Sequence, residues 1–167
     1  MTDLNSSAAV ILAAGKSTRM RCDLPKPLQP VCGLPLTRHV IRACQSVGVE
    51  RIVVVVGHCA DQVRAGLGDD VVYALQAEQR GSGHAAMCAR EALRDVTGPI
   101  LVLAGDVPLL TPVTLQRLLE ASSEPGYAGA MLTAEMDDPT GYGRVIRAAD
   151  GSVARIVEQK DATPEEA

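Results

Sequence analysis

Four short apolar runs constrain the fold of this chain more than any other feature. They span residues 8–14, 51–57, 71–76 and 99–105. Continuous apolar runs of this length are typical of strands that are covered on both faces. Segments with helical periodicity lie between them, and alternation of strand and helix predicts an α/β fold. We therefore expect a mostly parallel sheet with helices on both faces.

Three helices and a hairpin complete the predicted elements. Apolar residues recur on one face over residues 36–47, 82–94 and 111–121. We expect Ser82 and Thr111 to be the N-caps of the second and third of these helices. From about Tyr127 the pattern changes. The stretch "GAMLTAEM" predicts a further strand, and the segment around Asp150 and Gly151 predicts a β-hairpin.

The composition argues against several classes of protein. The chain has 167 residues, a formal net charge of -4 and five cysteines without C-x-x-C spacing. The negative charge argues against a broad nucleic-acid-binding surface, and the scattered cysteines argue against a zinc site or a disulfide framework. No apolar window is long enough to span a bilayer, and the N-terminus lacks the features of a signal peptide. We expect a cytoplasmic protein without a nucleic-acid or membrane partner.

The first apolar run leads into a basic, glycine-containing stretch. In an open parallel sheet, ligands bind outside the carboxyl ends of the strands. The segment "LAAGKSTRM" places Gly15 at this rim, where its backbone can approach an anion. Arg19 adds a guanidinium, and Lys26 follows on a loop that Pro25 and Pro27 stiffen. Together these residues predict phosphate binding, with one fixed ammonium for transition-state charge. A glycine turn with a solvated basic loop is the alternative.

Asp106 follows the fourth apolar run directly, in "LAGDVPLL". A carboxylate at this rim can hold Mg²⁺ against substrate phosphates. The same residue could instead cap the following helix, but Thr111 is available for that cap. We therefore predict a metal-binding role for Asp106.

The stretch "QAEQRGSGHA" predicts a nucleobase site. It places Gln76 at the end of the third run, and Gly81 and Ser82 before a helix. Amide side chains and open backbone suit the hydrogen-bonding edge of a base, although a polar turn with a helix cap would use the same residues. His84 is interpreted as a first-turn helix residue rather than a catalytic base.

Two residues near the end of the chain are candidates for sugar binding. Gly143, in "DDPTGYGR", either leaves its backbone open to a ligand or forms a tight turn. Glu158 either accepts hydrogen bonds from sugar hydroxyls or is a solvated carboxylate at a strand end.

Taken together, these motifs resemble one family. In order and spacing, "LAAGKSTRM", "LPKPL", "QAEQRGSGHA", "GDVPLL", "DDPTGYGR" and "VEQKDAT" are similar to the N-terminal uridyltransferase domain of the bacterial bifunctional GlmU proteins. The resemblance implies a Rossmann-like nucleotide-diphospho-sugar transferase fold. It also implies a Mg²⁺-dependent reaction in which N-acetylglucosamine 1-phosphate attacks the α-phosphate of UTP. The products would be pyrophosphate and UDP-N-acetylglucosamine, a precursor of peptidoglycan and lipopolysaccharide.

The resemblance implies a role for each matching position. Arg19 and Lys26 would neutralise phosphate charge, and Asp106 would hold Mg²⁺. The other positions would bind substrate: the nucleotide at Leu12, Ala13, Ala14, Gly15, Ala104 and Gly105, the uracil at Gln76, Gly81 and Ser82, and the amino sugar at Gly143 and Glu158. Three positions depart from the family pattern. Ser17 replaces a glycine, Ser82 replaces a threonine, and Ala104 stands where many members have tyrosine.

The resemblance also gives expectations about domain organisation. The family domain continues past "KDAT" into an Asn-bearing strand, and a later Asn completes its metal site. We therefore expect residues 1–167 to be the N-terminal part of a single nucleotidyltransferase domain, incomplete at its C-terminus. We expect no acetyltransferase β-helix domain, through which the full-length family proteins form trimers.

Several alternatives remain open at this point. The chain could bind nucleotides without catalysing transfer, because full catalysis would need the missing part. It could transfer a nucleotide to another sugar phosphate, or to a molybdopterin or polyol-type acceptor. A purely structural α/β module is the remaining alternative.

Overall fold

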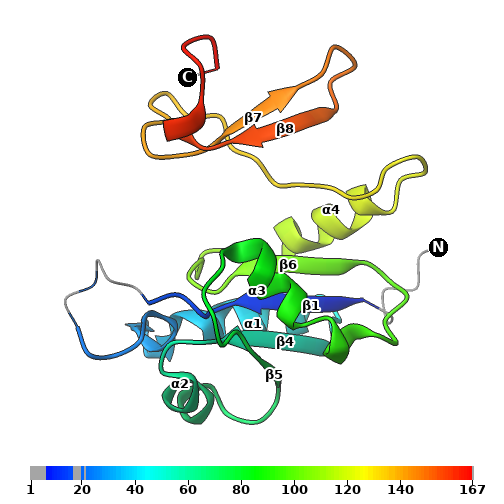
Figure 1. Ribbon diagram of the computed structural model, residues 1–167. Helices are drawn as coiled ribbons and strands as arrows, with labels where there is room; N and C mark the ends of the chain where they lie inside the picture. The colour runs from blue at the N-terminus through cyan, green and yellow to red at the C-terminus, as the bar shows by residue number, and fades with distance from the viewer. Residues whose placement is uncertain (1–6, 17–19, 21, 167) are drawn as a thin grey trace. The chain divides into compact units, whose positions relative to one another are not determined.

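The computed structural model describes residues 7–16, 20 and 22–166. These residues form two compact units, which meet in sequence between Ala130 and Met131. The first unit contains a parallel sheet with its helices, and the second contains an antiparallel hairpin (Figure 1).

The sheet of the first unit has four parallel strands in the order β5-β4-β1-β6. The strands are β1 (Ala8–Leu12), β4 (Arg51–Val56), β5 (Val72–Leu75) and β6 (Ile100–Ala104). In the centre of the sheet, Val10 of β1 pairs with Val53 of β4 and Val102 of β6. The chain adds β4 and β5 on one side of β1 and then returns to add β6 on the other. The strand order therefore reverses at β1, which is where α/β sheets bind ligands.

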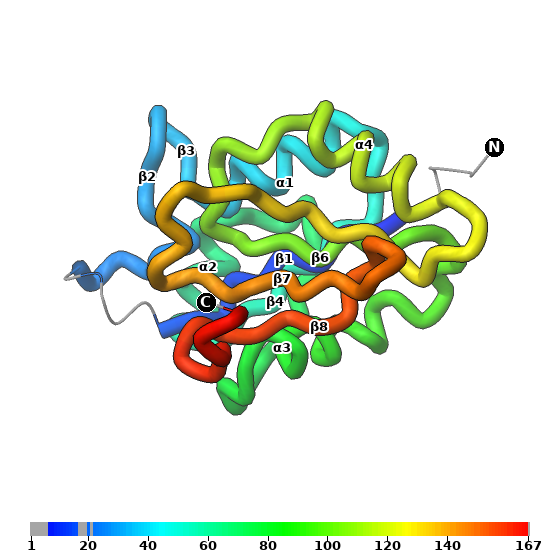
Figure 2. The backbone as a smooth tube through the Cα atoms, turned by 90° about the horizontal axis from the view of Figure 1, so that it is seen from above, coloured from blue at the N-terminus to red at the C-terminus, as the bar shows by residue number. Residues whose placement is uncertain are grey.

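Helices cover both faces of the sheet, which confirms the predicted α/β architecture. They are α1 (Leu36–Ser46), α2 (Ala60–Leu67), α3 (Ser82–Cys88) and α4 (Pro112–Ser122). Figure 2 shows α1 and α4 on one side of the sheet and α3 on the other. Among the described residues, none of the helices is long and apolar enough to cross a membrane.

Two hydrophobic clusters explain why the central strands are continuously apolar. Ile11 and Val54 belong to the larger cluster, together with residues of α1, α2 and α4. Val10 and Val53 point to the opposite face, where Ala85 of α3 belongs to the smaller cluster. Because successive side chains of a strand point to opposite faces, both sets must be apolar when both faces are covered.

Shorter elements complete the fold. In the first unit these are the 3₁₀ turns η2 (Lys26–Leu28) and η3 (Glu91–Leu93) and the strands β2 (Pro30–Val31) and β3 (Leu34–Pro35). The second unit contains β7 (Arg144–Arg147), β8 (Val153–Val157) and the 3₁₀ turn η4 (Gln159–Asp161). The hairpin predicted around Asp150 and Gly151 is confirmed. Gly151 has a φ of 83°, and Asp150 Oδ1 accepts a hydrogen bond from the Ser152 amide at 3.0 Å.

The predicted N-cap at Thr111 is also confirmed, because its side chain accepts a hydrogen bond from the Thr114 amide at 3.2 Å. The N-cap predicted at Ser82 is wrong: Ser82 is the first residue of α3, and Gly81 precedes it without a side-chain cap. The helix predicted over 82–94 is also too long. At its end, the amides of Ala89 and Arg90 bond to carbonyls three residues back, so the helix tightens and stops.

The strand predicted from "GAMLTAEM" is wrong. Residues 129–136 are exposed and have no regular structure, and no strand pairs with them within the described part of the chain. An apolar alternation forms a strand only where another strand supplies hydrogen bonds. Conversely, α2 was not predicted. It begins after Cys59, which is left-handed (φ 55°) and makes no side-chain cap, so the usual start signal is missing.

Candidate active site

The loop after β1 lies at the centre of the carboxyl rim. The Ala13 amide donates to the Val55 carbonyl at 2.9 Å, so the loop continues the pairing of β1 with β4. The Ala14 carbonyl accepts a hydrogen bond from Gln79 Nε2 at 2.7 Å. Ala13 and Ala14 are buried, but Gly15 is exposed, and a Cβ built on it would meet no atom within 4 Å. The loop is therefore fixed at its base and open at Gly15.

Two glycines let the neighbouring loops approach this loop closely. A Cβ built on Gly57, after β4, would lie 3.0 Å from the carbonyl oxygens of Ala14 and Gln76. A Cβ built on Gly105, after β6, would lie 2.9 Å from the Leu12 carbonyl oxygen. Real Cβ atoms essentially never come as close to a backbone oxygen as the contact at Gly105, and the contacts at Gly57 are tighter than nearly all real ones, so the packing of the rim favours glycine at both places. Sequence reasoning assigned Gly105 to ligand binding and missed this structural role.

A pocket of about 230 Å³ opens between the loops after β1 and β6. It is lined by Leu12, Ala13, Gly15, Lys26, Pro27, Gly105 and Asp106. In this pocket Lys26 Nζ forms an ion pair with Asp106 Oδ2, although the two residues are 80 positions apart. Their side chains are 36% and 38% exposed, so water and ligands can reach both. An exposed pair of this kind is weak, and a ligand can replace it at little cost.

The loop that carries Lys26 is held by several local contacts. Pro27 and Leu28 of η2 are buried, which anchors the turn against the core. Gln29 Nε2 donates to the Leu24 carbonyl at 2.8 Å and to Cys22 Sγ at 3.3 Å. The hydrogen bond from Gln29 lowers the pKa of the Cys22 thiol. These contacts give the rigidity that the prolines of "DLPKPL" predicted.

Thr37 bonds to the backbone next to Asp106, and sequence reasoning missed it. It lies in α1, is fully buried, and donates a hydrogen bond from Oγ1 to the Gly105 carbonyl at 2.8 Å. The only available signal was a threonine in a helix whose inward face is otherwise apolar. The hydroxyl satisfies a buried carbonyl directly before Asp106, so it fixes the backbone from which that carboxylate projects.

A second pocket, of about 460 Å³, opens on the other side of the β1 loop. It is lined by Lys16, Gly57, His58, Gln76, Ala77, Glu78 and Gln79. The Gln76 side chain is buried, whereas Gly81 and Ser82, at the start of α3, are exposed. Because Gly15 lines one pocket and Lys16 lines the other, the β1 loop separates them. We call them the carboxylate pocket, with Asp106, and the amide pocket, with Gln76.

The remaining predicted site residues are Arg19, Ala104, Gly143 and Glu158. Arg19 lies outside the described residues. Ala104 is the exposed last residue of β6. Gly143 and Glu158 belong to the second unit, where a Cβ on Gly143 would lie 3.2 Å from the Val157 carbonyl oxygen. That contact explains by local packing why a glycine stands at position 143. The sugar contacts of Gly143 and Glu158 stay predictions.

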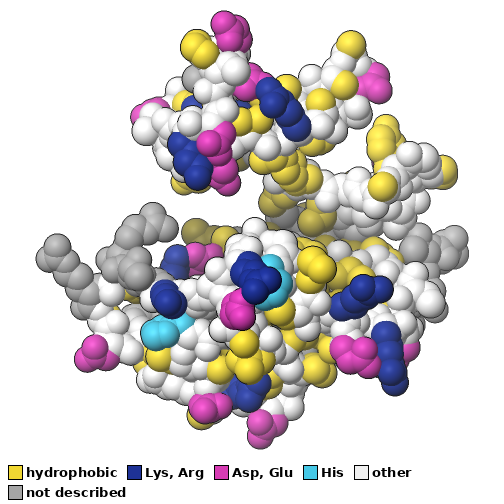
Figure 3. All heavy atoms as spheres, viewed as in Figure 1, with side chains coloured by type: hydrophobic (Ala, Val, Ile, Leu, Met, Phe, Trp, Pro, Cys, Tyr) yellow, Lys and Arg dark blue, Asp and Glu magenta, His cyan; other side chains and the backbone are white. Residues whose placement is uncertain are grey.

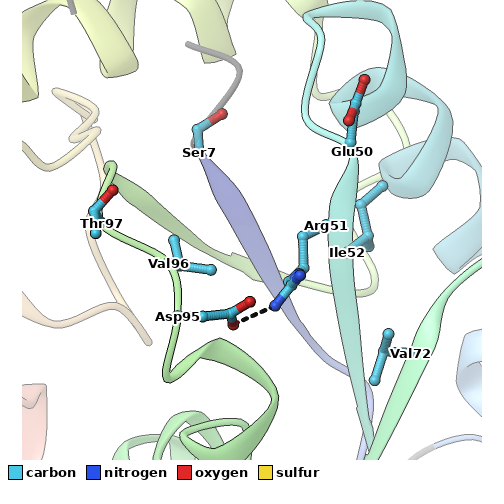
Figure 4. A pocket seen from close by; sticks show the side chains of 8 residues that line it. All are labelled: Ser7, Glu50, Arg51, Ile52, Val72, Asp95, Val96 and Thr97. Carbon is cyan, nitrogen blue, oxygen red and sulfur yellow. Dashed lines mark hydrogen bonds and ion pairs between the residues drawn. The ribbon is translucent and has the colours of Figure 1, made fainter. Parts of the chain in front are cut away.

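A further pocket, of about 410 Å³, lies at the opposite rim, where β4 and β5 begin. Figure 4 shows Arg51 reaching across it to Asp95, with 2.5 Å between Nη1 and Oδ1. Arg51 Nη1 also donates to the Ala92 carbonyl at 3.3 Å. These bonds tie the start of β4 to the segment before β6. They give this rim a structural role, whereas Lys26, Asp106 and Gln76, the described residues predicted for phosphate, metal and base, line pockets at the carboxyl rim.

Possible ligands depend on the surface charges and on the metal-binding types of side chain. Figure 3 shows basic and acidic side chains interspersed on the viewed face, without one continuous basic stripe. Within the described residues, no three or more His, Cys, Asp or Glu side chains form a cluster that could hold a metal ion.

Comparisons with known proteins identify relatives of this chain. The chain is 52% identical over 158 residues to the bifunctional protein GlmU of Exiguobacterium sibiricum; the match covers 95% of this chain and 35% of that protein. This chain thus spans about a third of the length of the curated relatives it matches. The resemblance to the N-terminal part of GlmU is confirmed.

Solved structures agree as well. A nucleotidyl transferase from Methanothermobacter is 31% identical, with a TM-score of 0.58 over 68% of this chain and 56% of that one. Rv0371C from Mycobacterium tuberculosis, solved in complex with manganese, is 26% identical, with a TM-score of 0.51 over 69% and 58%. The family model of the MobA-like NTP transferase domain matches residues 9–160. The chain therefore belongs to the MobA-like NTP transferase domain family, whose members are nucleotidyltransferases.

Proposed function

We propose that this chain transfers a uridylyl group from UTP to N-acetylglucosamine 1-phosphate, forming UDP-N-acetylglucosamine and pyrophosphate. The observation that carries the proposal is the meeting of Lys26 and Asp106 beside Gly15, at the point where the strand order reverses. A cation, a carboxylate and an open backbone are what the transfer of a nucleotidyl group requires. The similarity to the GlmU proteins supports UTP and the amino sugar phosphate as the substrates.

The two pockets suggest how the nucleotide lies. The base would occupy the amide pocket, near Gln76 and the start of α3, and the triphosphate would cross the loop at Gly15 and Lys16. The α-phosphate would then lie near Lys26 and Asp106. This arrangement uses both sides of the β1 loop, as expected for a ligand at a topological switch point.

Asp106 fits a divalent metal ion. Its carboxylate supplies hard oxygen ligands and lies in an accessible pocket, where an ion can approach it together with a phosphate. Mg²⁺, when bound, would supply positive charge to the phosphate oxygens. The mycobacterial relative was solved in complex with manganese, which supports the use of a divalent ion by this fold. Thr37, through the Gly105 carbonyl, would hold the backbone of Asp106 in place.

The reaction needs no covalent enzyme intermediate. A phosphate oxygen of the sugar phosphate would form a bond to the α-phosphorus of UTP. The bond from that phosphorus to the bridging oxygen of the β-phosphate would break, and pyrophosphate would leave. Lys26 would release Asp106 to the metal and turn its ammonium to the phosphate oxygens. Arg19 would add a second cation, and Gly143 and Glu158 would hold the amino sugar.

The test measures binding and turnover separately. UTP with Mg²⁺ should raise the melting temperature of the chain more than CTP or GTP does, and added N-acetylglucosamine 1-phosphate should release pyrophosphate. Asp106→Asn should remove the metal dependence, whereas Asp61→Asn, at a fully exposed position of α2, should not. Binding of UTP without release of pyrophosphate would favour a nucleotide-binding role. Equal response to another sugar phosphate would reassign the acceptor, and absence of any nucleotide response would refute the proposal.

A further inference from the structure

The Gln76 side chain in the amide pocket is fixed from two directions. It follows β5 directly and is only 4% exposed. Its Nε2 lies 3.1 Å from the Gly81 carbonyl oxygen and 3.1 Å from His84 Nδ1. Gly81 precedes α3, and His84 lies in the first turn of that helix. The start of α3 therefore holds the Gln76 amide through two contacts.

The chemistry of these contacts determines which way the amide points. A backbone carbonyl can only accept, so the Gln76 atom that faces Gly81 must be the NH₂ group. That group has two hydrogens, and the second is directed to His84. The Nδ1 atom of His84 must then be the acceptor, which places the proton of the neutral ring on Nε2. Both donors of Gln76 are used within the protein, and only its carbonyl oxygen is left for a ligand.

We infer that His84 is a positioning residue. It holds the Gln76 amide so that only the carbonyl oxygen, a hydrogen-bond acceptor, faces the base, and this orientation selects uracil over cytosine. This inference rests on the proposed function. Uracil carries an N–H at ring position 3, which can donate to the Gln76 carbonyl oxygen. Cytosine has an unprotonated nitrogen at that position, and two acceptors would face each other. A site built to hydrogen-bond one partner rejects an analogue that lacks the group, because buried polar atoms are then left unpaired.

His84 matters because a glutamine amide alone can read either base. If its second N–H lost its acceptor, only the Gly81 carbonyl would oppose rotation of the amide, and the orientation that presents NH₂ to the pocket, where cytosine would accept from it, would become more populated. With Nδ1 of His84 in place, rotation would bring the Gln76 oxygen against the Gly81 carbonyl and against a ring nitrogen that also only accepts. Two repulsive contacts would replace two hydrogen bonds, so the amide keeps one orientation.

The test compares UTP and CTP binding, in the presence of Mg²⁺, across three His84 variants. His84→Ala and His84→Leu remove the acceptor, whereas His84→Asn keeps an oxygen near the place of Nδ1. We expect Ala and Leu to reduce the preference for UTP over CTP by about fivefold or more, and Asn to restore most of it. His39→Asn is the matched control, because His39 bonds to the Val31 carbonyl at 2.8 Å and lines neither pocket. Melting curves without nucleotide show whether each variant is folded.

A second measurement is independent of nucleotide binding. Nitrogen-15 NMR at mildly alkaline pH should show His84 as the tautomer protonated at Nε2, with Nδ1 unprotonated. A proton on Nδ1 would overturn the inference, as would an unchanged ratio of UTP to CTP affinity in a folded His84→Ala protein. Either result would leave the proposed function intact. If the unsubstituted chain bound no UTP, the proposed function would fail, and the inference would fail with it.

Discussion

The substitution Gly105→Ala tests the packing of the carboxyl rim directly. The new Cβ would lie 2.9 Å from the Leu12 carbonyl oxygen and 3.1 Å from Thr37 Oγ1, and both neighbours are held in place. The Leu12 oxygen also accepts the Gly105 amide at 3.0 Å, and the Thr37 hydroxyl donates to the Gly105 carbonyl. A methyl group therefore has to displace backbone and strain two hydrogen bonds. Overpacking of this kind costs about 1–3 kcal/mol of unfolding free energy.

The assay is urea unfolding together with thermal melting, both without ligand. For a domain of this size the cost corresponds to a melting temperature lower by about 2–12 °C. Gly83→Ala is the matched control, because Gly83 lies inside α3 and a Cβ there would meet no atom within 4 Å. The same chemical change should stabilise the chain there by up to about 1 kcal/mol, from helix propensity. A Gly105→Ala protein as stable as the unsubstituted chain would refute the packing argument.

Three further predictions concern single side chains. Thr37→Val leaves a buried carbonyl without its donor and should lower the unfolding free energy by about 1–3 kcal/mol. It should also weaken the rise in melting temperature that UTP and Mg²⁺ cause. Thr37→Ser keeps the hydroxyl and should retain that rise. Hydrogen bonds from Arg38 lower the pKa of Asp70 to about 2, so Asp70 stabilises the fold above its ordinary pKa of 3.8 and loses this effect as the pH falls toward 2. Because the Asp70 side chain is 47% exposed, Asp70→Asn should lower the unfolding free energy by at most about 1 kcal/mol at pH 7, measured by urea unfolding. An equal loss at pH 2 would contradict the stabilising role of the ionised Asp70 carboxylate. Lys26→Ala should slow release of pyrophosphate by about 10²–10³-fold with the unfolding midpoint unchanged, and an unchanged rate would remove Lys26 from the site.

Local sequence patterns predicted the elements well where the local signal was complete. The Thr-Pro pair at residues 111 and 112 gave the start of α4, and Asp150 with Gly151 gave the hairpin turn, because the hydrogen bonds of caps and turns join residues close in sequence. The predictions failed where the partner is distant or the signal is absent. Residues 129–136 alternate like a strand but have no neighbouring strand in the described structure, and α2 begins at a left-handed cysteine.

The sequence by itself determined the four central strands and the rim at which the predicted ligand residues stand. Apolar runs that alternate with helical segments are typical of a layered α/β fold, in which the carboxyl ends of the parallel strands share one edge. The tertiary structure alone decided which residues meet at that edge. Strand order brought Lys26 to Asp106, helix packing placed Thr37 behind Gly105, and the start of α3 placed His84 against Gln76. Two of these contacts join residues far apart in the chain, and the third depends on how α3 packs on the sheet, so no local pattern encodes them.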